Sequence, residues 1–290
     1  MSMRRMWVKV ALCIAVLGVS SVARAGTTTL SGANTDFPDN DLVMPFATLD
    51  SRSTFFSITN IGDGIIRARW AFFDASGEKV DEVLRDIFGE GGTDVVDITA
   101  ISDRTIDSGG NFVLGPSRSL AGRNGFVIVY GDGSARLLGN FTIANLTTNA
   151  GFGVNASGFG TVGALAKGQG VVGTTFNPKT LQDNLLVILG LNPPPTLNSL
   201  TNGQAPSGTV FSVRIVLLGN DPQNAILAET TRAVRGSALF TSLEDLFPGV
   251  NLNGSASILA IAENTGIIGY YGQAVGAFGA GQTLRGGVVL

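Results

Sequence analysis

Histidine is absent from the 290 residues of this chain, and cysteine occurs once, as Cys13. Without histidine the chain has no imidazole for general base catalysis, for a Ser-His-Asp triad or for a zinc site of the usual kind. A single cysteine cannot form a disulfide within the chain, so an apolar core must hold the fold. These absences exclude most familiar catalytic chemistries and favour a protein that is not an enzyme.

Charge is also scarce. Charged residues make up 14% of the chain, against about a quarter in a typical globular protein. Acidic residues outnumber basic ones, and the formal net charge is −3. A weakly charged, acidic protein does not attract nucleic acids or anionic membranes. We therefore expect neither as a partner.

Long apolar runs are missing apart from one near the amino terminus. Residues 10–19 are apolar, follow Arg4, Arg5 and Lys9, and precede the small-x-small triplet at residues 23–25. This is the pattern of a cleaved export signal. The run is shorter than the roughly 20 residues that a membrane-spanning helix needs. The sequence predicts a signal peptide over residues 1–25 and no transmembrane span in the mature chain.

An export signal places the mature protein in the periplasm, on the cell surface or outside the cell. The adjacent Arg4 and Arg5 leave the twin-arginine route open beside the general secretory route. We favour the general route, because Met3 stands where Ser or Thr usually precedes the arginine pair. Cys13 lies inside the apolar run and is expected to leave with the signal.

Alternation of apolar and polar residues dominates the rest of the chain. One face of residues 65–73 carries Ile66, Ala68, Trp70 and Phe72, whereas Arg67 and Arg69 point the other way. This period of two predicts a half-buried strand. Residues 74–77 supply a turn, and residues 79–83 are expected to return as a hairpin partner. Residues 126–130 and 137–144 likewise predict a hairpin. With 40 glycines, the composition indicates an all-β protein with many turns.

Three short segments occur twice in the same order. Residues 84–89 return at 243–249, residues 137–141 at 267–271 and residues 54–58 at 209–213. Such a repeat predicts two related modules in tandem. We place module 1 at residues 26–175, with a loop insertion within residues 93–124, and module 2 at residues 176–290.

The repeated segment at 243–249 departs from strand periodicity. Ser242 can cap a short helix with Asp245 at its third position. Leu243, Leu246 and Phe247 then share one face, and Pro248-Gly249 ends the turn. We predict a one-turn helical plug here and a second one at residues 84–89, each closing one end of a sandwich.

Several short strands per module, separated by frequent turns, fit an immunoglobulin-like β-sandwich. The chain resembles exported bacterial proteins built of tandem immunoglobulin-like modules. The motifs that carry the resemblance are Pro45-Phe46, residues 56–60, Phe72-Phe73-Asp74-x-x-Gly77 and residues 243–249. The resemblance implies a fold and a compartment. That group is largely without assigned activity, so the resemblance implies no catalytic residues.

Two sets of carboxylates suggest possible chemistry. Asp36, Asp39 and Asp41 form an acidic cluster of the kind that binds calcium, although the spacing is not that of an EF-hand; a solvated, turn-forming arm is the alternative. The second set would suit glycoside hydrolysis, but we prefer a solvated sheet edge or loop, because Trp70, the one tryptophan outside the signal, is expected to face the core. Its members are Asp81, Glu82, Asp86, Glu90, Asp94 and Asp97.

The function that the sequence favours is that of a non-enzymatic exported protein. It would act as a cell-surface, matrix or envelope component through protein or glycan contacts, with residues 93–124 as the expected contact loop. One alternative is a self-assembling subunit that adds a strand to a neighbour's sheet, for which the apolar ending at residues 287–290 is a candidate donor. A carboxylate-dependent glycan hydrolase ranks last.

Overall fold

The structure is a computed structural model, and its described residues are nearly all strands. They are residues 41–88, 92–97, 104–106, 112–114, 120–131, 135–158, 170–175, 183–190, 210–219, 226–250, 256–262, 265–275 and 278–286. One short helix, α4 (Leu243–Leu246), accompanies the strands, so the all-β prediction is confirmed. No helix within these ranges is long and apolar enough to cross a membrane. The predicted signal peptide, residues 1–25, lies outside them.

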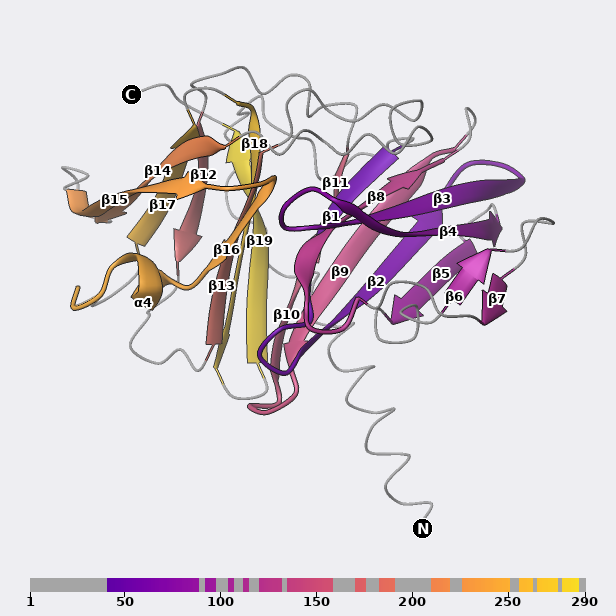
Figure 1. Cartoon of the computed structure of the whole chain (residues 1–290), viewed down its shortest axis with the longest axis horizontal. Coiled ribbons are helices and arrows are strands. Elements are labelled where there is room, and N and C mark those ends of the chain that lie inside the picture. The colour runs from indigo at the N-terminus through magenta and orange to yellow at the C-terminus, as the bar shows by residue number, and fades with distance from the viewer. Residues whose placement is uncertain are drawn as a thin grey trace, which may run out of the picture. The chain divides into compact units, whose positions relative to one another are not determined.

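The first half of the chain forms two sheets that share a core (Figure 1). One has the order β11-β1-β8-β3-β4, with the bounds Ser157–Gly158, Asp41–Ala47, Asn124–Tyr130, Ile65–Asp74 and Lys79–Phe88. The other has the order β10-β9-β2-β5, with the bounds Ala150–Asn155, Leu137–Asn145, Arg52–Asn60 and Gly92–Asp97. β6 (Arg104–Ile106) and β7 (Phe112–Leu114) form a small separate hairpin.

The second half forms a single eight-stranded sheet in the order β15-β14-β17-β12-β19-β18-β13-β16. The bounds in that order are Ile226–Val234, Phe211–Gly219, Ala256–Ala262, Gly170–Thr175, Phe278–Gly286, Ile267–Val275, Asp183–Gly190 and Ala238–Thr241. In both halves the paired strands run antiparallel.

The strand order of the first half returns in the second. The run β12-β17-β14-β15 repeats β1-β8-β3-β4, and β19-β18-β13-β16 repeats β10-β9-β2-β5. In the second half β19 takes the places of both β10 and β11, and its pairing with β12 joins the two runs into one sheet. The halves therefore share one topology. They differ in the last strand, which is two strands, β10 and β11, in the first half and a single strand, β19, in the second.

The repeat extends to local details of the β3–β4 and β14–β15 hairpins. Each hairpin has a β-bulge, after Phe72 in β3 and after Leu217 in β14. Aligning the bulges also aligns two cross-strand ion pairs, Arg69 with Glu82 and Arg214 with Glu229. This alignment relates the residues of the edge strands β4 and β15 one by one.

Several expectations about the repeat were wrong in detail. Residues 84–88 lie in strand β4 and are not a helical plug, because pairing with β3 decides their conformation. Residues 54–58 lie in β2, whereas residues 211–213 of the matching segment lie in β14. The topological equivalent of β14 is β3, so this sequence match does not join equivalent strands. Only 137–141 and 267–271 fall in equivalent strands, β9 and β18.

Two further expectations about strand partners also fail. Residues 126–130 and 137–144 form β8 and β9, which lie in different sheets and are not a hairpin. The predicted module boundary after residue 175 follows β12, yet β12 pairs with β17 and β19 and so belongs to the second half. The predicted insertion within residues 93–124 lies in the connection from β5 to β8, which contains the β6–β7 hairpin.

The immunoglobulin-like part of the fold prediction is not confirmed. In an immunoglobulin sandwich the first two strands are neighbours in one sheet. Here β1 pairs with β8 and β11, whereas β2 pairs with β5 and β9 in the other sheet. Residues 31–290 group as one compact unit, within which strand pairing distinguishes the two halves.

Strand β13 shows why the halves are not separate. Leu186 and Ile188 point into the core of the second half. Leu185, Val187 and Leu189 point the other way and join the core of the first half. The strand is apolar on both faces because both faces are buried.

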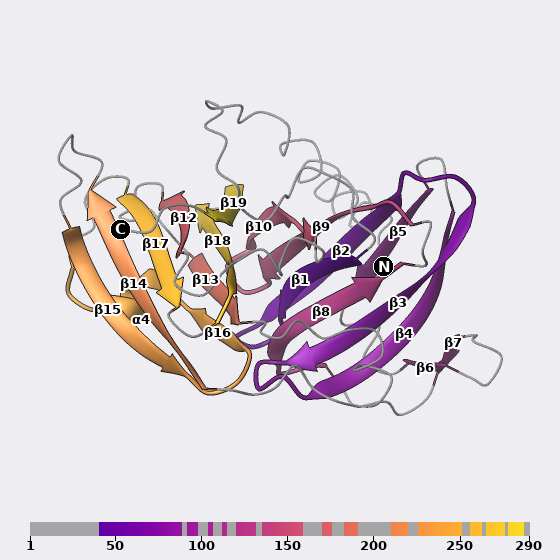
Figure 2. The same ribbon diagram turned by 90° about the horizontal axis from the view of Figure 1, so that it is seen from above.

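Glycines let the backbones of the two halves approach closely, where β10 lies beside β18 and β19 (Figures 1 and 2). A Cβ on Gly279 would overlap the carbonyl oxygen of Gly151, and one on Gly272 would overlap the ring of Phe152. A Cβ on Gly281 would lie 2.6 Å from the carbonyl oxygen of Gly153. Part of the high glycine content therefore serves this contact.

Candidate functional site

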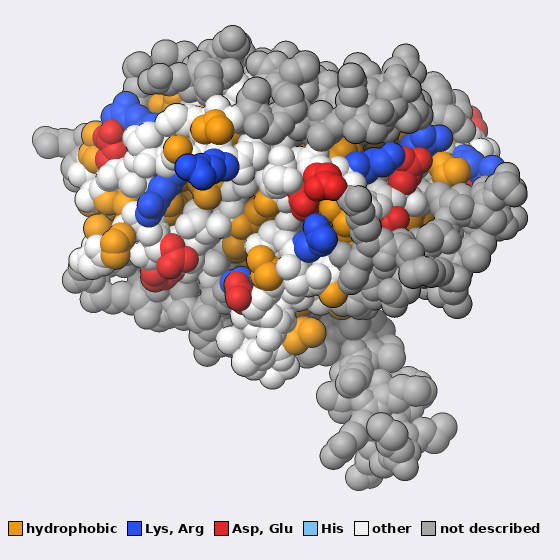
Figure 3. All heavy atoms as spheres, viewed as in Figure 1, with side chains coloured by type: hydrophobic (Ala, Val, Ile, Leu, Met, Phe, Trp, Pro, Cys, Tyr) orange, Lys and Arg blue, Asp and Glu red, His pale blue; other side chains and the backbone are white. Residues whose placement is uncertain are grey.

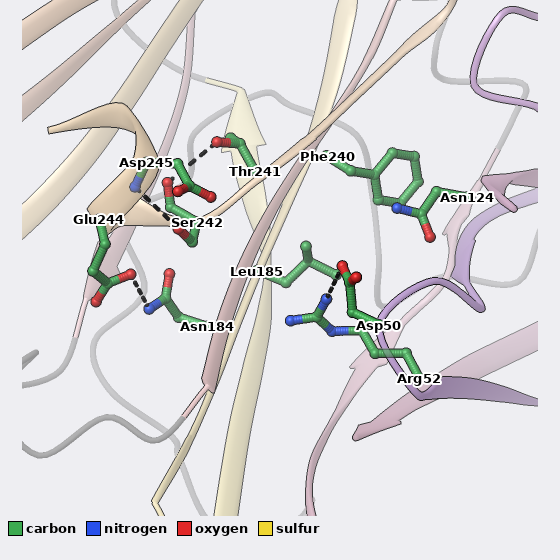
Figure 4. A pocket seen from close by; sticks show the side chains of 10 residues that line it. All are labelled: Asp50, Arg52, Asn124, Asn184, Leu185, Phe240, Thr241, Ser242, Glu244 and Asp245. Carbon is green, nitrogen blue, oxygen red and sulfur yellow. Dashed lines mark hydrogen bonds and ion pairs between the residues drawn. The ribbon is translucent and has the colours of Figure 1, made fainter. Parts of the chain in front are cut away.

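A polar cleft of about 350 Å³ lies between the β1–β2 turn and the segment that runs from β16 into α4 (Figure 4). Its lining brings together residues from both halves of the chain. They are Asp50, Arg52, Asn124, Asn184, Leu185, Phe240, Thr241, Ser242, Glu244 and Asp245.

The α4 wall of the cleft is held by hydrogen bonds to two side chains. Ser242 caps the helix, since its Oγ accepts from the backbone N–H of Asp245 at 3.1 Å. Asn184 is 5% exposed; its Oδ1 accepts from the backbone N–H of Leu243 at 2.8 Å, and its Nδ2 donates to Glu244 at 2.7 Å. Leu246 is buried behind this wall. The predicted cap, the one-turn helix and the burial of Leu243, Leu246 and Phe247 are confirmed.

The opposite wall is the tight β1–β2 turn. Asp50 and Ser51 have positive φ values of 54° and 60°, which side chains rarely adopt. The turn is tied to the β9–β10 turn, because the backbone N–H of Leu146 donates to the carbonyl oxygen of Ser51. Arg52 lies 3.5 Å from the carboxylate of Asp50; the side chain of Arg52 is 13% exposed and that of Asp50 is 80% exposed. The turn therefore presents a carboxylate to solvent beside a largely covered guanidinium.

The lining of the cleft is mixed in character. Carboxylates, amides and hydroxyls offer acceptors and donors around a floor of Leu185 and Phe240 (Figure 4). The hydroxyl oxygen of Ser242 accepts the capping hydrogen bond at the start of α4. Behind α4, burial and then the charge of Glu244 raise the pKa of Tyr271.

The predicted calcium ligands are described only in part. Asp36 and Asp39 lie outside the described residues. Asp41 begins β1 opposite Tyr130, and its charge adds to burial in raising the pKa of that tyrosine. Within the described part of the chain, no group of three or more His, Cys, Asp or Glu side chains could hold a metal ion. The calcium site stays a prediction.

Among the carboxylates considered for hydrolysis, the three whose side chains are described, Asp81, Glu82 and Asp86, do not line the cleft. Glu82 lies 3.2 Å from Arg69 and 2.8 Å from Lys79 on the outer face of the first half. Asp86 accepts two hydrogen bonds from Arg67, which lower the pKa of Asp86. Glu90 and the side chains of Asp94 and Asp97 lie outside the described residues. Trp70 is buried, as predicted.

The residues that do line the cleft were missed because they come from distant parts of the sequence. Only Ser242 and Asp245 carried a local signal, the helix cap. The predicted contact loop at residues 93–124 contributes its last residue, Asn124. Over the face drawn in Figure 3, the described charged side chains lie in small groups of mixed sign.

Comparison with known proteins identifies no relative in sequence. No family model and no curated protein matches the chain. Among solved structures, a turret protein of Sulfolobus turreted icosahedral virus is aligned over 88% of this chain and 98% of its own, with 9% identity and a TM-score of 0.17. At that TM-score the likeness carries no argument about fold or function.

Proposed function

We propose that this chain is an exported, non-enzymatic component of the cell envelope or surface that binds a glycan in the polar cleft. The observation that carries the proposal is the cleft itself. It joins a carboxylate-bearing turn to a capped helix across a partly apolar floor.

The lining suits a ligand with many hydroxyl groups. Asp50, Glu244 and Asp245 accept hydrogen bonds, whereas Arg52 and the amide of Asn124 donate them. A few placed polar groups around an apolar floor are typical of small-molecule sites. Both walls are held by hydrogen bonds, which reduces the ordering cost of binding.

A binding function fits the cleft better than hydrolysis does. The chain has no histidine, and Asn184 holds Glu244 in place. A glycan hydrolase is the competing hypothesis, because a pair of carboxylates can suffice for that reaction. The same experiment separates the two.

The test is calorimetric titration of the protein with a panel of soluble oligosaccharides, followed by analysis of the sugars. We expect binding without new reducing ends. Asp50→Ala should weaken binding by at least about tenfold, as loss of a hydrogen bond to a charged group costs about 1.5–3 kcal/mol. Asp63→Ala, which also removes an exposed carboxylate, is the matched control.

Three outcomes contradict the proposal. If no oligosaccharide of the panel binds, the proposed glycan ligand is wrong. Equal binding by the Asp50→Ala variant and the native chain places the site elsewhere. Cleavage of a bound oligosaccharide makes the chain a hydrolase. A protein ligand, captured from envelope extracts and competing at Asp50, would replace the glycan.

A further inference from the structure

Strand β15 ends the eight-stranded sheet, and among the described residues it pairs only with β14. Most of its nine residues are exposed or half-buried, and Ile226 and Leu227 are 56% and 49% exposed. An open strand edge presents unpaired backbone N–H and C=O groups that can pair with another chain. Proteins commonly protect such an edge with charged side chains.

The repeat supplies an internal reference for this edge. Strand β4 ends the equivalent sheet of the first half, and the shared bulge aligns Val80 with Leu227. The charged residues of β4 at the aligned positions are replaced in β15: Lys79 by Ile226, Asp81 by Ala228 and Asp86 by Ala233. Val80 is also 6% exposed, far less than Leu227. The two edges share the bulge and the edge position; β15 keeps Glu229 and Arg232 and lacks three charges that β4 carries at Lys79, Asp81 and Asp86.

We propose that β15 is an interaction surface for a second copy of this chain, and that the two β15 strands pair antiparallel. Such pairing is self-complementary about a twofold axis. With the axis at Thr231, Glu229 of one copy lies opposite Ala233 of the other and diagonal to Arg235, which has the opposite charge. The two copies of Arg232 lie diagonal to each other, and each guanidinium donates a hydrogen bond to the carbonyl oxygen of Asp245 in its own chain. No like charges lie directly opposite in this register.

The composition of β15 also fits pairing with itself. Thr230, Thr231 and Val234 are β-branched, which favours the strand conformation at an added edge. Glu229 is held by two hydrogen bonds from Arg214 of its own chain, at 2.7 and 2.8 Å, so little bare charge faces the partner. This interaction is separate from the cleft and does not depend on the proposed glycan.

Cysteine cross-linking tests the proposal in the folded protein. Cys13 is the one native cysteine, so a chain with Cys13→Ser and Thr231→Cys carries a single thiol. We expect mild oxidation to link two copies through residue 231. Leu84 occupies the aligned position in β4, and Leu84→Cys in the same background should stay unlinked.

Moving the charges of β4 into β15 gives the second test. The triple variant Ile226→Lys, Ala228→Asp, Ala233→Asp should convert a dimer into a monomer in sedimentation equilibrium. If this variant fails to fold, sedimentation of the single variant Ala233→Asp and the cross-linking result test the proposal instead. A native chain that is monomeric at all concentrations overturns the proposal. So does a dimer that Thr231→Cys does not link and the variant does not dissociate.

Discussion

Tyr270 shows what a single side chain contributes to the joining of the halves. Its hydroxyl lies 2.9 Å from both the carbonyl oxygen of Val43 and the Oγ of Ser157. With one proton, it donates to the carbonyl and accepts from Ser157. Its ring contacts Phe141 edge to face. The sequence match of residues 137–141 with residues 267–271 makes Asn140 its equivalent in the first half, so the tyrosine marks a difference between the repeats.

We predict that the buried tyrosines make the folded state less stable at high pH. Burial raises the pKa of Tyr130, Tyr270 and Tyr271, which are the three tyrosines of the chain. An unfolded tyrosine ionises at about pH 10, so the folded state holds protons that the unfolded state releases above that pH. Stability should therefore be full below about pH 10 and fall as the pH rises further.

The measurement is tyrosinate absorbance and circular dichroism along one alkaline titration. The two signals should change together, because ionisation requires unfolding. Tyrosinate that forms at the ordinary pKa while the circular dichroism is unchanged would contradict the buried placement of these rings.

At the scale of elements, the local sequence pattern predicted the helix and some strands correctly, whereas pairing with a distant strand decided the conformation of others. The strand at residues 65–73 and its turn at 74–77 were predicted, since alternation and turn residues are local signals. α4 was predicted from its cap for the same reason. Residues 84–88 have a similar composition but form a strand, because β3 provides a hydrogen-bonding partner.

The packing of β19 on β10 yields a prediction about glycine. Gly279→Ala should destabilise the fold by about 1–3 kcal/mol, the usual cost of overpacking, because its Cβ would overlap the backbone of Gly151. Gly153→Ala is the matched control, since its Cβ meets Thr142 at an ordinary 3.4 Å. Denaturant unfolding measures both. Equal stability of the two variants would show that β19 does not pack on β10 this closely.

On the scale of the whole molecule, the halves share a core as well as a topology. Leu185, Val187, Ile268 and Tyr270 come from the second half, yet they pack in the core of the first. The outer face of the β18–β13 sheet is thus covered by the neighbouring half. Neither half can unfold without exposing apolar surface of the other.

We therefore predict one cooperative unfolding transition for the whole chain. Calorimetry should give equal calorimetric and van't Hoff enthalpies. Tyr270→Ala should shift this single transition to lower temperature, since loss of a buried aromatic costs about 3–5 kcal/mol. Two resolved transitions, with only one of them moved by the variant, would mean that the halves are independent domains.

The sequence by itself determined what depends on neighbours along the chain. Alternation gave the all-β class and the buried face of Trp70, and Ser242 gave the helix cap. The tertiary structure decided which strands pair, which half β12 joins, and that Asp50 and Glu244 line one cleft. These features depend on contacts between residues far apart in sequence. Many short apolar strands have similar sequence patterns, so the pattern does not identify which of them pair. The choice among partners is made by burial and register, which exist only once the sheets have formed.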